Sequence, residues 1–113
     1  MSRKILYSPG FGAGWTTWNH DPKVKAYMLT YKPIIKFLEG GGKFTNADCH
    51  EGKKLHPILK QLQQECKKKF KEDYVCVLGA DDLKVISVAG RVRIEEYDGS
   101  ESIEEEGEFS NWL

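Results

Sequence analysis

Apolar positions divide the chain into a helical first part and a strand-rich last part. Across residues 22–39 apolar side chains recur every three or four positions, which is the period of one helix face. Asp21 precedes a proline, a pairing typical of an N-cap and the first helical position, and the three glycines at 40–42 end the pattern. Because Pro33 lies inside it, we expect a kinked helix or two short helices that meet near residues 30–32.

A second helix is predicted to start at Pro57, because the apolar positions that follow share one face. These positions are Leu55, Leu59, Leu62, Cys66 and Phe70. Lysines 67–69 fall in its last turns, where positive charge complements the helix dipole. We prefer that interpretation to a nucleic-acid patch.

After residue 73 the pattern changes to that of β-strands. Short apolar runs alternate with turn residues at 74–78, 83–88, 91–97 and 100–105, and a further short run lies at 4–7. We therefore predict an α+β fold in which a short N-terminal strand and two helices pack on a mainly antiparallel β-sheet with a C-terminal hairpin.

The hairpin has the strongest local signal, since Asp98-Gly99 favours a two-residue type I′ turn. That turn sets a register of Tyr97 opposite Ser100, Ile94 opposite Ile103, Arg93 opposite Glu104 and Arg91 opposite Glu106. Val92 and Ile94 then face the core, and the two arginines share the other face. Such a pair of arginines either binds two phosphates or is paired with the opposite glutamates, and the register leaves both alternatives open.

A chain of 113 residues is large enough to bury a core, and we expect a single domain over residues 1–113. No apolar run approaches the roughly 20 residues that span a bilayer, and no signal peptide is evident, so no membrane contact is expected. The three cysteines, Cys49, Cys66 and Cys76, are odd in number and form no Cys-x-x-Cys pair. They indicate reduced thiols in a cytosol; we expect Cys66 and Cys76 to be core residues, and no metal or cofactor.

The net charge is zero, but its distribution is uneven. Residues 1–73 hold 14 Lys and Arg against 7 Asp and Glu, whereas residues 74–113 hold 3 against 10. Identical copies that pair a basic half with an acidic half would form a homo-oligomer, which we expect. The neutral total and the lack of an arginine stripe disfavour duplex nucleic acid as a partner.

Residues 7–18 carry the clearest candidate chemistry, because three alternate glycines are interleaved with aromatic residues. Glycines allow a close approach to backbone N–H donors, and the aromatic rings offer flat faces, so the loop suits a ligand with a ring and an anionic part. The spacing matches neither the dinucleotide nor the triphosphate loop. The alternative is a tight turn whose tryptophans pack on the sheet.

Three segments resemble a family of short bacteriophage proteins, the first class of Thoeris anti-defence proteins. The segments are Ile5-Leu-Tyr-Ser-Pro-Gly-Phe-Gly-Ala-Gly-Trp15, Leu78-Gly-Ala-Asp-Asp-Leu-Lys-Val85 and Arg91-Val-Arg-Ile-Glu-Glu-Tyr-Asp-Gly-Ser-Glu101. The resemblance implies a protein in the cytoplasm of the infected bacterial host that sequesters a cyclic ADP-ribose isomer without cleaving it. Some members of the family also hold cyclic oligonucleotides.

The resemblance also implies a set of ligand-binding residues, and no catalytic ones. The loop would supply stacking faces and amides, two arginines would bind the pyrophosphate, and an aspartate would accept hydrogen bonds from ribose hydroxyls. The set is Phe11, Gly12, Ala13, Gly14, Trp15, Asp82, Arg91 and Arg93.

Two other functions remain open at this point. An enzyme of nucleotide hydrolysis or transfer would need a general base, for which Glu95 beside Arg93 is the best candidate. An inhibitor would use the acidic residues from 104 onward to occupy a basic groove on a host nuclease. A stable complex with a protein partner, and no small-molecule ligand, would distinguish the inhibitor.

Overall fold

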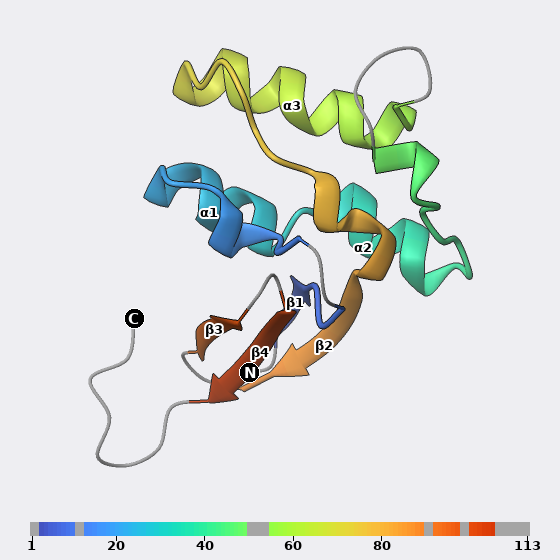
Figure 1. Cartoon of the computed structure of the whole chain (residues 1–113), viewed down its shortest axis with the longest axis vertical. Helices are drawn as coiled ribbons and strands as arrows, with labels where there is room; N and C mark the ends of the chain where they lie inside the picture. Colours follow the sequence, from blue (N-terminus) through green and yellow to red (C-terminus); the bar gives the residue numbers. More distant parts are fainter. Residues whose placement is uncertain (1–2, 11–12, 50–54, 90–91, 98–99, 106–113) are drawn as a thin grey trace.

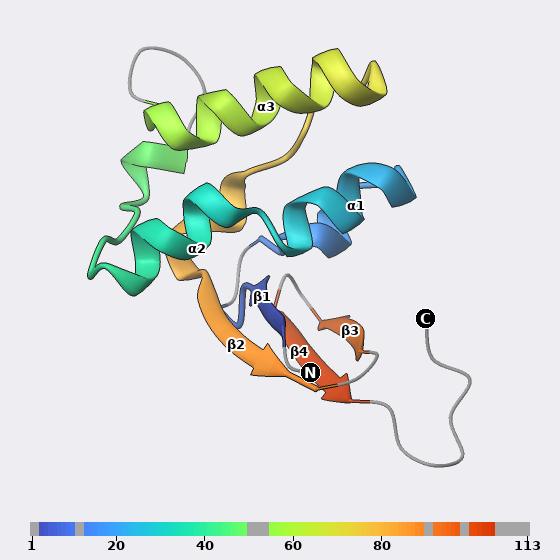
Figure 2. The same cartoon turned by 180° about the vertical axis from the view of Figure 1, so that it is seen from behind.

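The computed structural model describes residues 3–10, 13–49, 55–89, 92–97 and 100–105. The helices of this part are α1 (Pro22–Leu29), α2 (Lys32–Glu39) and α3 (Pro57–Phe70), and its strands are β1 (Arg3–Tyr7), β2 (Lys84–Val88), β3 (Val92–Tyr97) and β4 (Ser100–Glu105). Figures 1 and 2 show α1 and α2 between α3 on one side and the strands on the other. The α+β class predicted from the sequence is confirmed.

The first helical segment is two short helices rather than one kinked helix. A carboxylate oxygen of Asp21 accepts the N–H of Lys23 at 2.8 Å and caps α1, as predicted. Pro33 falls in the first turn of α2, where a missing N–H costs nothing and the fixed φ suits a helix. The chain therefore breaks between Leu29 and Lys32, and α2 ends before the glycine run.

Helix α3 begins at Pro57, as predicted, and three of the five predicted apolar positions are fully buried. His56 caps it, since the imidazole Nδ1 accepts the N–H of Ile58 at 3.1 Å. Leu59, Leu62 and Cys66 are fully buried, which confirms that Cys66 is a core residue.

The strands form two antiparallel ladders within the described residues, rather than one sheet. Strand β1 pairs with β2, and β3 pairs with β4. The β3–β4 register is the predicted one, with Ile94 opposite Ile103 and Arg93 opposite Glu104. The two ladders are linked where the N–H of Glu101 donates to the carbonyl of Ser8 at 2.7 Å.

The prediction of a strand over residues 74–78 is wrong. Residues 75–77 are buried, as their apolar character requires, but the backbone groups of Val75 and Cys76 bond to side chains instead of to a neighbouring strand. The Asn19 amide donates to the Cys76 carbonyl at 3.1 Å and accepts its N–H at 2.9 Å. Gln63 donates to the Val75 carbonyl at 2.8 Å. A 3₁₀ turn at Leu78–Asp82 then follows.

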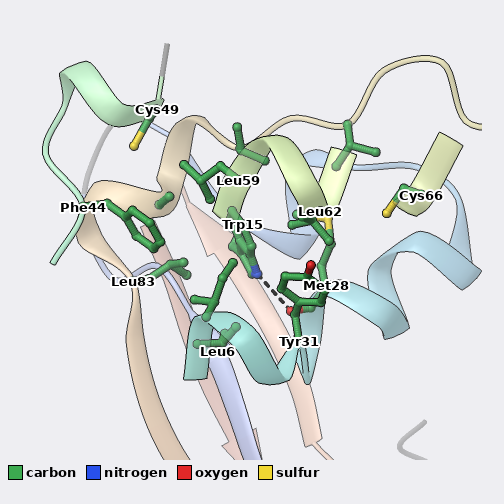
Figure 3. Packing of buried hydrophobic residues seen from close by; sticks show 14 of the residues in the cluster. Leu6, Trp15, Met28, Tyr31, Phe44, Cys49, Leu59, Leu62, Cys66 and Leu83 are labelled. Carbon is green, nitrogen blue, oxygen red and sulfur yellow. Dashed lines mark hydrogen bonds between the residues drawn. The ribbon is translucent and has the colours of Figure 1, made fainter. Parts of the chain in front are cut away.

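The main core joins the three helices to β1 and to the 75–83 segment, with Trp15 in its middle (Figure 3). Trp15 is fully buried, and its indole N–H donates to the carbonyl of Met28 at 3.1 Å. Burial raises the pKa of the Cys49 and Cys66 thiols to about 11, so both stay protonated at neutral pH. A smaller cluster, centred on Ile5, Val88 and Val92, lies between the two ladders.

Candidate functional site

The described structure holds a groove of about 890 Å³, which we call the lysine groove. Its walls come from β1, β2, the end of α2 and the Leu78–Asp82 turn. Its polar and backbone lining includes Lys4, Gly10, Lys43, Asp81, Asp82 and Lys84. The start of the glycine loop (residues 8–17) and one expected site residue, Asp82, therefore share this groove.

The charges of the lysine groove are only partly paired. Lys4 forms an ion pair with Glu39. Within the described part of the chain, however, Lys43, Lys84 and Asp82 have no side-chain hydrogen bond or ion pair. Two ammonium groups and one carboxylate of the groove are therefore without a side-chain partner among the described residues.

The Leu78–Asp82 turn packs directly on the glycine loop, although some 65 residues separate them. A Cβ atom added at Gly79 would lie 2.5 Å from the carbonyl oxygen of Gly14 and 2.8 Å from that of Ala13. One added at Gly10 would overlap the Asp82 carboxylate. Glycine at both positions is what allows this approach.

A buried carboxylate organises the other end of the glycine loop. Glu101 of β4 is 2% exposed, and its oxygens accept four hydrogen bonds. The N–H of Ser8 donates to Oε1 at 2.8 Å, and the N–H of Trp15 donates to Oε2 at 2.7 Å. Thr17 donates its N–H at 3.1 Å and its hydroxyl at 2.6 Å to Oε2. Within the described residues no cation pairs with Glu101, so these donors alone compensate its desolvation.

Glu101 changes what the glycine loop is able to bind. The N–H groups of Ser8, Trp15 and Thr17 already hold an internal anion, so they are not the bare donors that the sequence indicated. Trp15 has no exposed surface, so its ring is a core element and not the stacking face that we expected. The sequence allowed either a ring that stacks on a ligand or a tryptophan that packs inside the protein, and Trp15 is the second.

The structure places the expected residues in more than one location. Ala13 and Gly14 lie in the loop, where the Ala13 carbonyl accepts the Ser8 hydroxyl at 3.2 Å. Phe11, Gly12 and Arg91 lie outside the described residues.

Arg93 does not share a cavity with Asp82. Its guanidinium forms ion pairs with Glu95 at 2.9 Å and with Glu104 at 3.1 Å. It also lines a second cavity, of about 370 Å³, whose lining has no residue in common with the lysine groove. The cross-strand pairing that the register left open is therefore present.

Sequence reasoning assigned no role to Glu101 or to the groove lysines. For Glu101 a signal existed: the Asp98-Gly99 register places it on the face of Ile103, and a charged residue at an inward position requires partners. For Lys43 and Lys84 no such signal exists, because these two lysines come to line the same groove only through the packing of α2 against β2.

Comparisons with protein-family models, with curated proteins and with solved structures find no match to this chain. Within the described residues, no group of three or more His, Cys, Asp or Glu side chains is placed to hold a metal ion. No described helix has the length and apolar character that crossing a membrane requires.

Proposed function

We propose that the protein binds and sequesters a cyclic nucleotide signal of the cyclic ADP-ribose type without cleaving it, and that the lysine groove is the site. In this proposal it acts against host defence in the cytoplasm of an infected bacterium. The observation that carries the proposal is that one large groove brings Gly10 and Asp82 together with Lys43 and Lys84.

The chemistry of the groove suits the parts of such a ligand. Ammonium groups bind a pyrophosphate as point charges, so Lys43 and Lys84 would hold it. The unpaired carboxylate of Asp82 would accept hydrogen bonds from ribose hydroxyls. Leu38 and Val85 add apolar lining for a base, and a volume of about 890 Å³ lies within the range of small-molecule sites.

We propose Lys43 and Lys84, rather than the arginines, as the contact for the anion. Arg93 carries two glutamate partners and lines another cavity, whereas Lys43 and Lys84 lack partners within the described residues. Asp82 keeps the role that the resemblance implied.

The first test is calorimetric titration of the full chain with cyclic ADP-ribose isomers and cyclic dinucleotides. The complex is then heated, and the released ligand is identified by chromatography. Recovery of intact ligand would support sequestration. Recovery of an altered ligand would show instead that the protein is an enzyme. If no nucleotide binds, and a host protein forms a stable complex instead, the nuclease inhibitor becomes the better hypothesis.

Groove variants locate the site. We expect Lys84→Gln and Asp82→Asn each to weaken binding by about tenfold or more, because each removes a charged hydrogen-bonding partner. Lys36→Gln is the matched control, since Lys36 is exposed on α2 and lines none of the described cavities. Equal affinities for all three variants would exclude the lysine groove as the site.

A further inference from the structure

We propose that the second cavity, which we call the arginine hollow, binds a small organic phosphate monoester. Its lining is Arg3, Thr16, Thr17, Pro22, Lys25, Ala26, Leu29, Val92, Arg93 and Ile94. The proposal is independent of the function proposed for the lysine groove.

Three cationic residues from three separate elements line the arginine hollow: Arg3 from β1, Lys25 from α1 and Arg93 from β3. No acidic residue is in its described lining. Within the described part of the chain, the side chains of Arg3 and Lys25 have no hydrogen bond or ion pair. The like charges of Arg3 and Lys25 at one cavity repel each other, and a bound dianion would relieve that repulsion.

Arg93 contributes a cation whose orientation is already set. Its contacts to Glu95 at 2.9 Å and Glu104 at 3.1 Å hold the guanidinium across the face of the hairpin. A side chain restrained in this way loses less conformational entropy when a ligand binds. Arg3 and Lys25 provide the main charged contacts to the phosphate in this proposal.

The rest of the lining indicates what accompanies the phosphate. Pro22, Ala26 and Leu29 of α1 form an apolar wall on one side, and Val92 and Ile94 of β3 form another. Apolar walls beside cations fit a ring or short hydrocarbon that carries one phosphate group. A volume of about 370 Å³ is at the small end of ligand sites, which favours one ring with one phosphate over a polymer.

The hollow is also connected to the buried carboxylate. Thr17 lines the hollow, while its N–H and hydroxyl both donate to Glu101. The position of this wall therefore depends on the same contacts that hold the glycine loop.

The test uses phenyl phosphate as the probe, titrated into the full chain at low ionic strength by calorimetry. Phenol lacks the charge, and inorganic phosphate lacks the ring. We expect phenyl phosphate to bind at least tenfold more tightly than either, and to weaken as salt is added. Binding of inorganic phosphate as tight as that of phenyl phosphate, or no binding of phenyl phosphate, would overturn the proposal.

Variants assign the binding to this cavity. Arg3→Gln and Lys25→Gln should each weaken phenyl phosphate about tenfold, and Lys36→Gln should leave it unchanged. Arg3→Gln should still weaken phenyl phosphate binding when it is combined with Lys84→Gln, which separates this site from the lysine groove. Thermal melting of each variant checks that it is folded. Equal losses in Lys25→Gln and Lys36→Gln would contradict a defined site.

Discussion

At the scale of single residues, Glu101 decides how the glycine loop is held. The sequence of the loop has the glycines that suit an external anion, yet the N–H groups of Ser8, Trp15 and Thr17 donate to a carboxylate supplied by β4. A buried carboxylate without a cation is stable only while its oxygens accept several hydrogen bonds. Glu101 is therefore a structural anion that holds Ser8, Trp15 and Thr17 in place before any ligand arrives.

Substitution of Glu101 should be costly. Glu101→Gln places an amide donor against N–H groups, and we expect it to lower the free energy of unfolding by about 1–3 kcal/mol. Glu101→Ala leaves those donors buried and unpaired, and should cost about 3–5 kcal/mol. Urea denaturation measures both.

Glu104→Gln on the same strand is the control for Glu101. Glu104 is exposed and pairs with Arg93, so its loss should change stability by less than about 1 kcal/mol. If the Glu101 and Glu104 variants were equally stable, Glu101 would not organise the loop.

The buried thiols predict a loss of stability at alkaline pH. Cys49 and Cys66 have folded pKa values near 11 against an ordinary value of 9.0, so the folded state retains the proton more strongly. Their contribution is complete below pH 9 and is lost as the pH rises from about 9 through 11. We expect each thiol to cost about 1 kcal/mol at pH 10 relative to neutral pH.

Urea denaturation at neutral pH and at pH 10 measures this loss, and Cys66→Ala should reduce the difference. Tyr27 and Tyr31 affect the stability only at higher pH. Burial and the hydrogen bond to Glu65 raise the pKa of Tyr27 to about 12 and also raise that of Tyr31. Wild-type stability that does not change between the two pH values would contradict the assignment.

At the scale of elements, the 75–77 segment shows how a strand-like sequence is used without a strand. Its apolar residues are buried in the core, but Asn19 and Gln63 supply the hydrogen bonds that a neighbouring strand would otherwise make. The amide of Asn19 also donates to the carbonyl of Trp15 at 3.0 Å. One side chain thus joins the glycine loop to the segment that leads into Asp82.

Asn19→Ala should destabilise the protein by about 2–4 kcal/mol, because it leaves the polar backbone atoms of Cys76 buried without partners. Asn46→Ala is the matched control, since Asn46 is exposed and its change should cost less than about 1 kcal/mol. Both are measured by urea denaturation. A neutral Asn19→Ala would mean that the 75–77 segment is held by apolar packing alone.

At the scale of the whole molecule, the uneven charge bears on assembly. The basic first 73 residues and the acidic remainder are complementary between copies as well as within one chain. A site that binds a small molecule tightly encloses most of it, and a second copy over the lysine groove would provide such enclosure. The homo-oligomer expected from the sequence stays a prediction.

Light scattering at micromolar protein concentration measures the oligomeric state. We expect a mass that is a multiple of the chain mass, which decreases toward the monomer as salt rises because screening weakens the pairing of unlike charges. A monomer at low salt, with and without a bound cyclic nucleotide, would show the expectation to be wrong.

The sequence by itself determined the local elements. Asp21 and Pro22 begin α1, Pro33 separates two short helices, and Asp98-Gly99 pairs Arg93 with Glu104, as the structure confirms. Each depends on interactions within a few residues, so periodicity, caps and turn preferences are sufficient. The strand over 74–78 was predicted by the same rules and is wrong, because a strand also needs a partner from elsewhere in the chain.

Only the tertiary structure decided which groups line a cavity and which are buried. Trp15 is buried, Glu101 lies 86 positions from it and binds its N–H, and Asp82 and Arg93 line different cavities. These facts depend on contacts between segments distant in the sequence, where the packing of α1, α2 and the two ladders determines distance and burial. A pattern of residue types specifies what each group is able to bind, whereas the fold determines which of those groups are still available.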